Sequence, residues 1–189
     1  MILERLLILT MFSLISTSCV EEHFKEDVTF VGGQKVTADT LNYGRNVYME
    51  NCMACHGDKG DGKGVASKGL LPPPRDLTLG VYKFGHVISG ELPTDKDFYR
   101  IIKDGLKGTA MLPWDLTQEQ LYGVTQYLKT FAMETWTDKE SSIGETVVLV
   151  NDPWSNNKAE GIARGKEVYH IEAECQSCHR AYATPQELN

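Results

Sequence analysis

Apolar residues recur at helical spacing in three stretches of this chain. Such spacing places them on one face of a helix, which then packs inward. We therefore expect three helices in the first two thirds of the sequence. The stripes consist of Gly44, Val47, Tyr48 and Cys52; of Phe98, Ile101 and Ile102; and of Leu121, Val124, Leu128 and Phe131.

Residues at the helix ends support the second and third of these helices. Thr94 precedes the second stripe, as an N-cap residue does, and Gly105 follows it as a stop. Thr117 is followed three residues later by Gln120, which is a capping-box pattern. The glycine of the first stripe either lets an aromatic residue of the last helix, Tyr127, approach closely or only permits a turn.

The chain contains two copies of Cys-x-x-Cys-His, the attachment signature of c-type haem. They read Cys52-Met-Ala-Cys55-His56 and Cys175-Gln-Ser-Cys178-His179. Two thioether bonds need sulfurs about one helical turn apart, and the next residue then directs its imidazole onto the iron. A redox dithiol or half of a zinc site would use the cysteine pair without requiring the histidine. We predict two haems c, with His56 and His179 as proximal ligands.

The N-terminus has the features of an export signal. Arg5 is followed by an apolar run over residues 6–15 and by small residues that lead to Cys19. The run is too short to span a bilayer. Cys19 is the one cysteine outside the haem motifs, and its surroundings are similar to a bacterial lipobox with the apolar residue displaced by one position. We predict lipidation of Cys19 and a membrane-anchored periplasmic lipoprotein; ordinary cleavage is the alternative.

The charge of the chain narrows the choice of partners. The formal net charge is -7, which argues against nucleic-acid binding. An acidic surface can steer a basic redox partner at low salt, although a solvated face without such a role is the commoner case.

Two segments after the first motif are predicted to surround its haem. Residues 57–64 are rich in glycine but do not match a phosphate-binding loop, so we expect backbone that wraps a haem edge. A carbonyl of the segment Leu71–Pro74 could accept a hydrogen bond from Nδ1 of His56, which would set its tautomer and basicity. The sequence does not identify the carbonyl, and a simple loop spacer is the alternative.

Met111 is our candidate for the distal ligand of the first haem. It lies in a turn-rich segment far enough along the chain from His56 to return over the other face. A thioether ligand favours ferrous iron and raises the reduction potential. Met133, after the last helix, is its main rival.

Together these residues resemble the class I cytochrome c family over about ninety residues, with Cys52, Cys55, His56 and Met111 on the family's ligand positions. The resemblance implies an all-α class I cytochrome c fold, with helices wrapped around a covalently bound haem. The runs at residues 73–78, 92–95 and 108–111 are similar to those of dihaem periplasmic or lipoprotein cytochromes found beside respiratory complexes.

An internal repeat indicates a second unit of the same kind. Gly44-Arg-Asn-Val-Tyr48 reappears as Gly165-Lys-Glu-Val-Tyr169, with two more residues before the second motif. The second copy is too short to close a class I fold, so we expect either a fragment of a longer protein or a haem site completed by the first unit or a partner. Its distal ligand is not predicted. The expected organisation is a signal peptide (1–18), a polar tether (19–40), a cytochrome c domain (41–135), a linker with one β-like run (136–160) and the N-terminal part of a second cytochrome c domain (161–189).

The expected ligation indicates the function. A haem with histidine and methionine ligands has no open position for a substrate, so it passes single electrons. We predict an exported electron carrier rather than an enzyme, free or as a subunit of a respiratory oxidoreductase complex, with redox proteins as partners. A dihaem peroxidase with an open second haem, and a docking module that haem only stabilises, are the alternatives.

Overall fold

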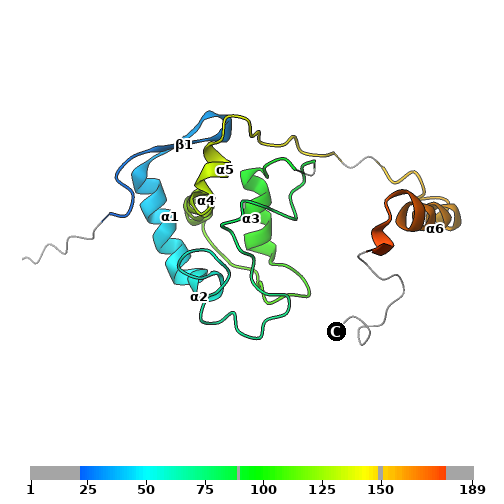
Figure 1. Cartoon of the computed structure of the whole chain (residues 1–189), viewed down its shortest axis with the longest axis horizontal. Helices are drawn as coiled ribbons and strands as arrows, with labels where there is room; N and C mark the ends of the chain where they lie inside the picture. Colours follow the sequence, from blue (N-terminus) through cyan, green and yellow to red (C-terminus); the bar gives the residue numbers. More distant parts are fainter. Residues whose placement is uncertain (1–21, 89, 149–150, 178–189) are drawn as a thin grey trace, which may run out of the picture. The chain divides into compact units, whose positions relative to one another are not determined.

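The three apolar stripes lie on three helices of the first structural unit. The computed structural model describes residues 22–88, 90–148 and 151–177. The stripes fall on α1 (Ala38–Asn51), α3 (Asp95–Asp104) and α4 (Gln118–Thr130) (Figure 1). This unit, which extends to Val147, also contains β1 (Val28–Phe30), a 3-10 turn (Val31–Gly33), β2 (Gln34–Val36), α2 (Met53–His56) and α5 (Met133–Thr137). The chain is thus mostly helical.

The predicted helix ends are confirmed. Thr94 and Thr117 are the N-caps of α3 and α4, and each takes part in a complete capping box. α3 ends at Gly105, whose φ of 65° favours glycine. Local sequence signals therefore determine where these two helices begin and where α3 stops.

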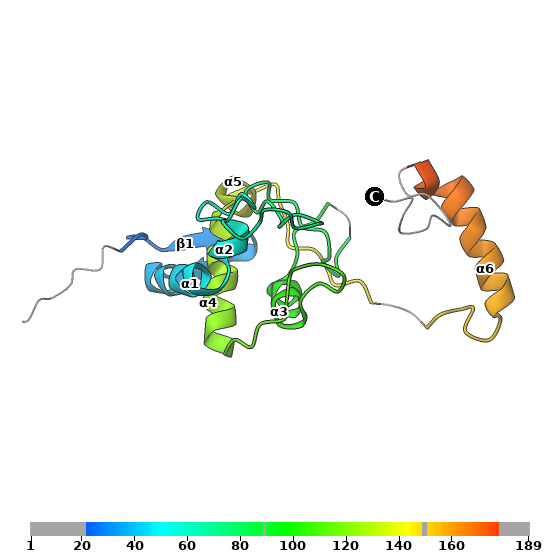
Figure 2. The same ribbon diagram turned by 90° about the horizontal axis from the view of Figure 1, so that it is seen from below.

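The crossing of α1 and α4 depends on two glycines. A Cβ atom on Gly44 would lie 1.9 Å from the backbone oxygen of Gly123 and 3.1 Å from Cβ of Tyr127. Figure 2 shows α4 passing across α1. The close approach predicted for Tyr127 is present, but the tightest contact is with the backbone of α4. The helices bury a continuous core that includes Leu41, Val47, Tyr48, Leu121, Val124, Leu128 and Trp136.

Part of the segment predicted as a polar tether instead forms a β-hairpin. β1 and β2 pair in antiparallel register, with Phe30 opposite Gln34. Phe30 and Val36 are 2% and 1% exposed, so the hairpin contributes to the core. Its sequence signal is Gly32-Gly33, both at positive φ, between two short alternating runs. The tether prediction therefore needs correction over residues 28–36.

Part of the predicted linker packs on the first unit. The backbone N–H of Leu92 donates to the carbonyl oxygen of Ser142 at 3.1 Å, and the N–H of Gly144 donates to the carbonyl oxygen of Leu92 at 2.9 Å. The N–H of Val147 donates to the carbonyl of His86 at 2.7 Å. The β-like run predicted within the linker forms no strand at residues 146–148, its described part. An isolated bridge pairs Ile143 with Leu92 instead. Residues 141–147 therefore form a strap beside the loop that precedes α3.

The second unit contains the repeated sequence. α6 (Lys158–Glu167) continues into a π-helical turn, Val168–Glu172, and a short 3-10 turn, Cys175–Ser177. A π turn holds an extra residue, which accommodates part of the longer spacing before the second motif. Nothing lies within 4 Å of a Cβ placed on Gly165, whereas its counterpart Gly44 is packed against α4. The described residues of this unit do not show a second cytochrome fold.

Three predicted site residues, Cys19, Cys178 and His179, lie outside the described residues, as does the predicted signal peptide. Among the residues that are described, no helix has both the length and the apolar character needed to cross a bilayer.

Asp97 of α3 gives the first unit a pH-dependent contribution to stability. Burial alone would raise its pKa, but the N–H groups of His86 and Thr94 and the Thr94 hydroxyl together lower the pKa below 3.8. The contribution of Asp97 to the free energy of unfolding is fully present above pH 3.8, the ordinary pKa of the carboxyl. It is lost as the pH falls through the lower pKa of the folded state. We expect Asp97→Asn to cost about 1–3 kcal/mol at pH 7 and less at pH 3. Denaturant unfolding at both pH values measures this, with the exposed Asp104→Asn as control; equal losses at both would contradict it.

Candidate haem site

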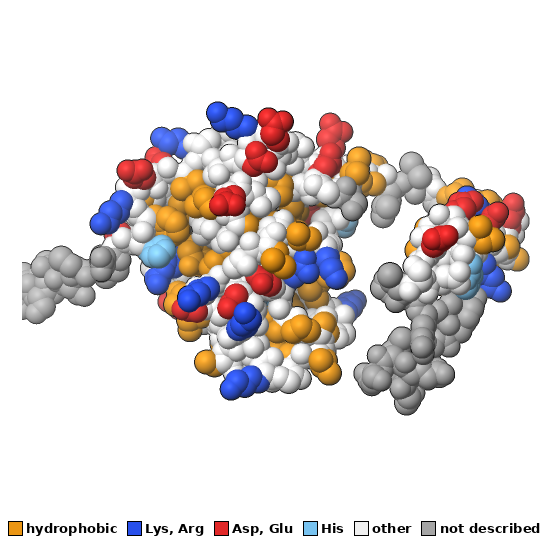
Figure 3. Space-filling model, in the orientation of Figure 1, with side chains coloured by type: hydrophobic (Ala, Val, Ile, Leu, Met, Phe, Trp, Pro, Cys, Tyr) orange, Lys and Arg blue, Asp and Glu red, His pale blue; other side chains and the backbone are white. Residues whose placement is uncertain are grey.

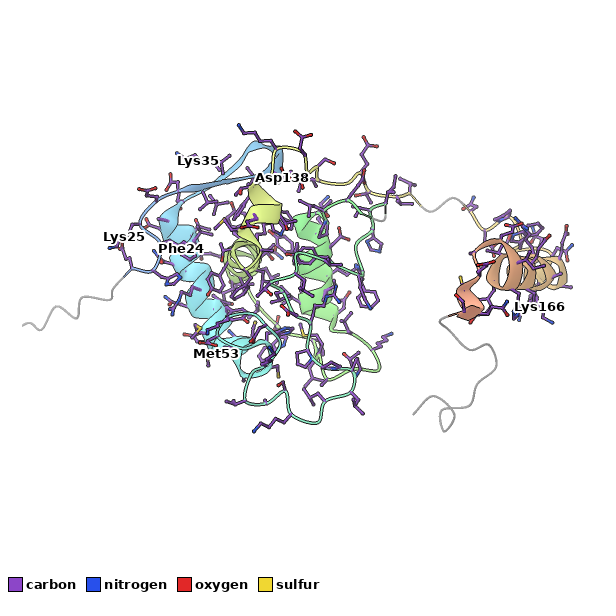
Figure 4. The ribbon with its side chains drawn as sticks, viewed as in Figure 1. Phe24, Lys25, Lys35, Met53, Asp138 and Lys166 are labelled. Atoms are coloured by element: carbon purple, nitrogen blue, oxygen red, sulfur yellow. The ribbon has the colours of Figure 1, made fainter. Side chains whose placement is uncertain are left out.

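The first Cys-x-x-Cys-His motif lies at the junction of two helices. Cys52 caps the C-terminus of α1 and the N-terminus of α2, and α2 carries Cys55 and His56 (Figure 4, where Met53 marks the motif). Both thiols are half-buried and outside any disulfide. Burial, followed by the neighbouring Cys55, raises the pKa of Cys52 to about 12. Cys52 and Cys55 lie three residues apart where the chain enters α2, which is about one helical turn, as two thioether bonds to one haem require.

The glycine-rich loop after the motif holds the end of α2. Its backbone N–H groups donate to the four carbonyl groups of α2 at 2.8–3.1 Å, so these helix-terminal acceptors are satisfied. A Cβ on Gly64 would lie 2.2 Å from the carbonyl oxygen of Ala54, so that position accepts only glycine. The donor and acceptor pairs are Gly57 with Met53, Ala66 with Ala54, Gly64 with Cys55, and Gly62 with His56. The loop thus wraps the motif itself.

The ring of His56 is oriented by a backbone carbonyl. Its Nδ1 lies 3.2 Å from the carbonyl oxygen of Arg75, one residue beyond the segment in which we sought this partner. Burial lowers the pKa of His56, and the Arg75 carbonyl acts in the opposite direction. A neutral ring that donates from Nδ1 leaves Nε2 for iron. The geometry therefore fits a proximal haem ligand.

The loops near the motif carry many exposed apolar side chains. Most of the exposed large apolar side chains of the first unit lie between α2 and α3 or just after α3. Figure 3 shows hydrophobic surface on one face of this unit. A flat, largely apolar group would cover such side chains. Those on the loops are Val65, Leu71, Leu79, Val81, Phe84, Ile88 and Leu112.

Met111 lies in an ordered loop after α3. Its N–H donates to Oγ1 of Thr109 at 3.1 Å, and its carbonyl accepts from Leu106 at 2.9 Å. Met133 and Met49 line a different feature, a pocket of about 400 Å³ at the α1–α4 crossing whose lining does not include His56. Met111 remains the predicted axial ligand.

These features together are those of a c-type haem-binding site. Residues 39–128 match the family model described as cytochrome c oxidase, cbb3-type, subunit III. A chain in the Kuenenia stuttgartiensis reducing HAO-like protein complex Kustc0457/Kustc0458 is 42% identical to this chain with a TM-score of 0.60. That match covers 72% of this chain and 60% of the other, so our chain spans less than two thirds of that neighbour. No curated protein matches. The match over residues 39–128 supports a c-type cytochrome domain there, and such a domain implies covalent haem c.

Tyr48 connects the helix crossing to the haem motif. Its side chain is fully buried, lies beside the rings of Tyr127 and Phe131, and donates from its hydroxyl to the carbonyl of Gly57 at 2.7 Å. Burial raises its pKa. We expect Tyr48→Phe to cost about 1–2 kcal/mol, because the Gly57 carbonyl loses its buried donor. Denaturant unfolding tests this, with Tyr43→Phe on the partly exposed face as control; equal losses in the two variants would refute it.

Proposed function

We propose that this protein is an exported electron carrier that transfers single electrons through covalent haem in a respiratory chain. The observation that carries the proposal is the His56 geometry: one cysteine at the junction of α1 and α2, a second on α2, and a proximal imidazole fixed through Nδ1 by the Arg75 carbonyl. When bound, the haem supplies an iron centre that gains and loses one electron. Cys52 and Cys55 hold the group, and His56 orients it.

The finer parts of the proposal rest on sequence. Cys175, Cys178 and His179 would hold a second haem c, and Cys19 would carry a lipid anchor in the periplasm. The similarity to a chain of a reducing HAO-like protein complex supports a role as a subunit of an oxidoreductase complex, with a redox protein as partner. The same proposal includes a membrane-bound location for that complex.

Methionine ligation by Met111 makes the proposal testable. We expect the haem-loaded chain to titrate reversibly in one-electron steps and to turn over little hydrogen peroxide with a reduced donor. Met111→His should lower the potential of one haem, because a second imidazole stabilises ferric iron more than a thioether does. Met133→Leu is the matched control and should leave the potential unchanged. Rapid peroxide turnover would contradict an electron carrier and favour a peroxidase.

A further inference from the structure

The carbonyl that meets His56 belongs to the peptide bond between Arg75 and Asp76. Its direction is therefore set by how this peptide plane is rotated. A small rotation would move the oxygen out of hydrogen-bonding range, since such bonds weaken steeply with distance and angle. The residues that fix the plane consequently control the orientation of the proximal ligand.

Both residues of this peptide are anchored by their own side chains. Nε and Nη2 of Arg75 donate to the carbonyl oxygen of Val81 at 3.1 and 2.7 Å. On the other side, Oδ1 of Asp76 accepts from the N–H of Thr78 at 3.0 Å and from its hydroxyl at 2.6 Å. The hydroxyl of Thr78 lowers the pKa of Asp76, so the acceptor is a carboxylate at neutral pH.

Other contacts hold the segment against the glycine-rich loop that follows α2. The N–H of Leu77 donates to the carbonyl of Gly60 at 2.7 Å. A Cβ on Gly62 would lie 2.6 Å from the oxygen of Pro74, so the glycine permits the approach. The contacts with Gly60 and Gly62 position the segment. The side-chain hydrogen bonds of Arg75 and Asp76 act on the two residues that flank the carbonyl.

We propose that Arg75, supported by Asp76, is a positioning residue that aims its own carbonyl at Nδ1 of His56 and thereby sets the basicity of the iron ligand. The inference rests on the proposed function, because it concerns His56 as a haem ligand. A strong Nδ1–H···O bond makes the imidazole a better donor to ferric iron and lowers the reduction potential. Loss of the arginine anchor weakens that bond and raises the potential.

The experiment compares Arg75→Gln with Arg100→Gln in the full, haem-loaded chain. Arg100 is a matched control, since its guanidinium also donates to a backbone carbonyl, that of Phe84, in the same unit. The readouts are the exchange rate of the His56 Nδ1 proton, measured by NMR in the ferrous protein, and the potential of its haem. We expect about tenfold faster exchange and a higher potential in Arg75→Gln, with Arg100→Gln like the wild type.

Two milder variants keep the inference falsifiable if Arg75→Gln does not fold. Arg75→Lys retains one donor for Val81 and should restore much of the slow exchange, whereas Thr78→Val removes one anchor of Asp76 and should speed exchange modestly. If exchange and potential in every folded Arg75 and Thr78 variant match the wild type, the inference is wrong. A wild-type chain without covalent haem at the first motif would instead overturn the proposed function, and this inference with it.

Discussion

Gly44→Ala is expected to destabilise the first unit by about 3 kcal/mol or more and to reduce the yield of haem-bearing protein. The added methyl group would lie 1.9 Å from a backbone oxygen of α4, which cannot move aside without separating the helices. Because Cys52 directly follows α1 as its C-cap, a shift of α1 displaces the haem motif as well. Denaturant unfolding of the purified variant measures the loss.

Two other glycines serve as controls for this effect. In Gly123→Ala the methyl group would meet Cδ1 of Tyr43 at 2.9 Å, a side chain that can rotate, so we expect a smaller loss. Gly165→Ala changes the equivalent position of the repeat, where nothing lies within 4 Å, and should leave the first unit unaffected. If all three variants were equally stable, the tight crossing would be refuted.

Lys129→Ala is expected to cost about 3–5 kcal/mol, the range for removing one partner of a buried ion pair. The side chain of Lys129 is 1% exposed, and its Nζ donates to Asp95, Gln34 and Gln126 at 2.6, 2.8 and 2.9 Å. The ammonium also lies over the ring of Trp136, 4.8 Å from its centroid. Burial lowers the pKa of Lys129, and Asp95 opposes that shift.

A double-mutant cycle separates this network from simple loss of packing. Lys129→Met keeps most of the side-chain volume but leaves the Asp95 carboxylate without its cation, so combining it with Asp95→Asn should cost less than the sum of the two single changes. Lys103→Ala, on the exposed face of α3, should change stability by no more than about 0.5 kcal/mol. Additive losses in the cycle would show that the ion pair does not hold these elements together.

The features predictable from sequence are those encoded locally. The capping boxes at Thr94 and Thr117 and the stop at Gly105 lie beside the helices they delimit, so their patterns are readable without knowing the fold. The haem motif is equally local, because five consecutive residues carry its chemistry. A carbonyl acceptor for His56 was also anticipated close to its true position at Arg75.

The features that were missed depend on contacts between distant residues. Gln34, in the segment taken for a tether, bonds to Asp95 and Lys129 on α3 and α4, which no local pattern reveals. A lysine in a helical segment ordinarily indicates a solvated face, yet here Asp95 and two amides make its burial tolerable. The strap over residues 141–147 pairs with a loop rather than a strand, so it lacks the alternation that would have identified it.

The most direct test of the central claim is the intact mass, with a reduced-minus-oxidised spectrum, of the chain expressed with haem-maturation machinery. It should be compared with a Cys52→Ser/Cys55→Ser variant and, as a matched control, a Cys175→Ser/Cys178→Ser variant. We predict that the wild type carries covalent haem with a c-type spectrum and that the first variant loses one haem, that of His56. A wild-type chain without added haem mass, or a first variant with the full wild-type haem content, would contradict a cytochrome c site at residues 52–56.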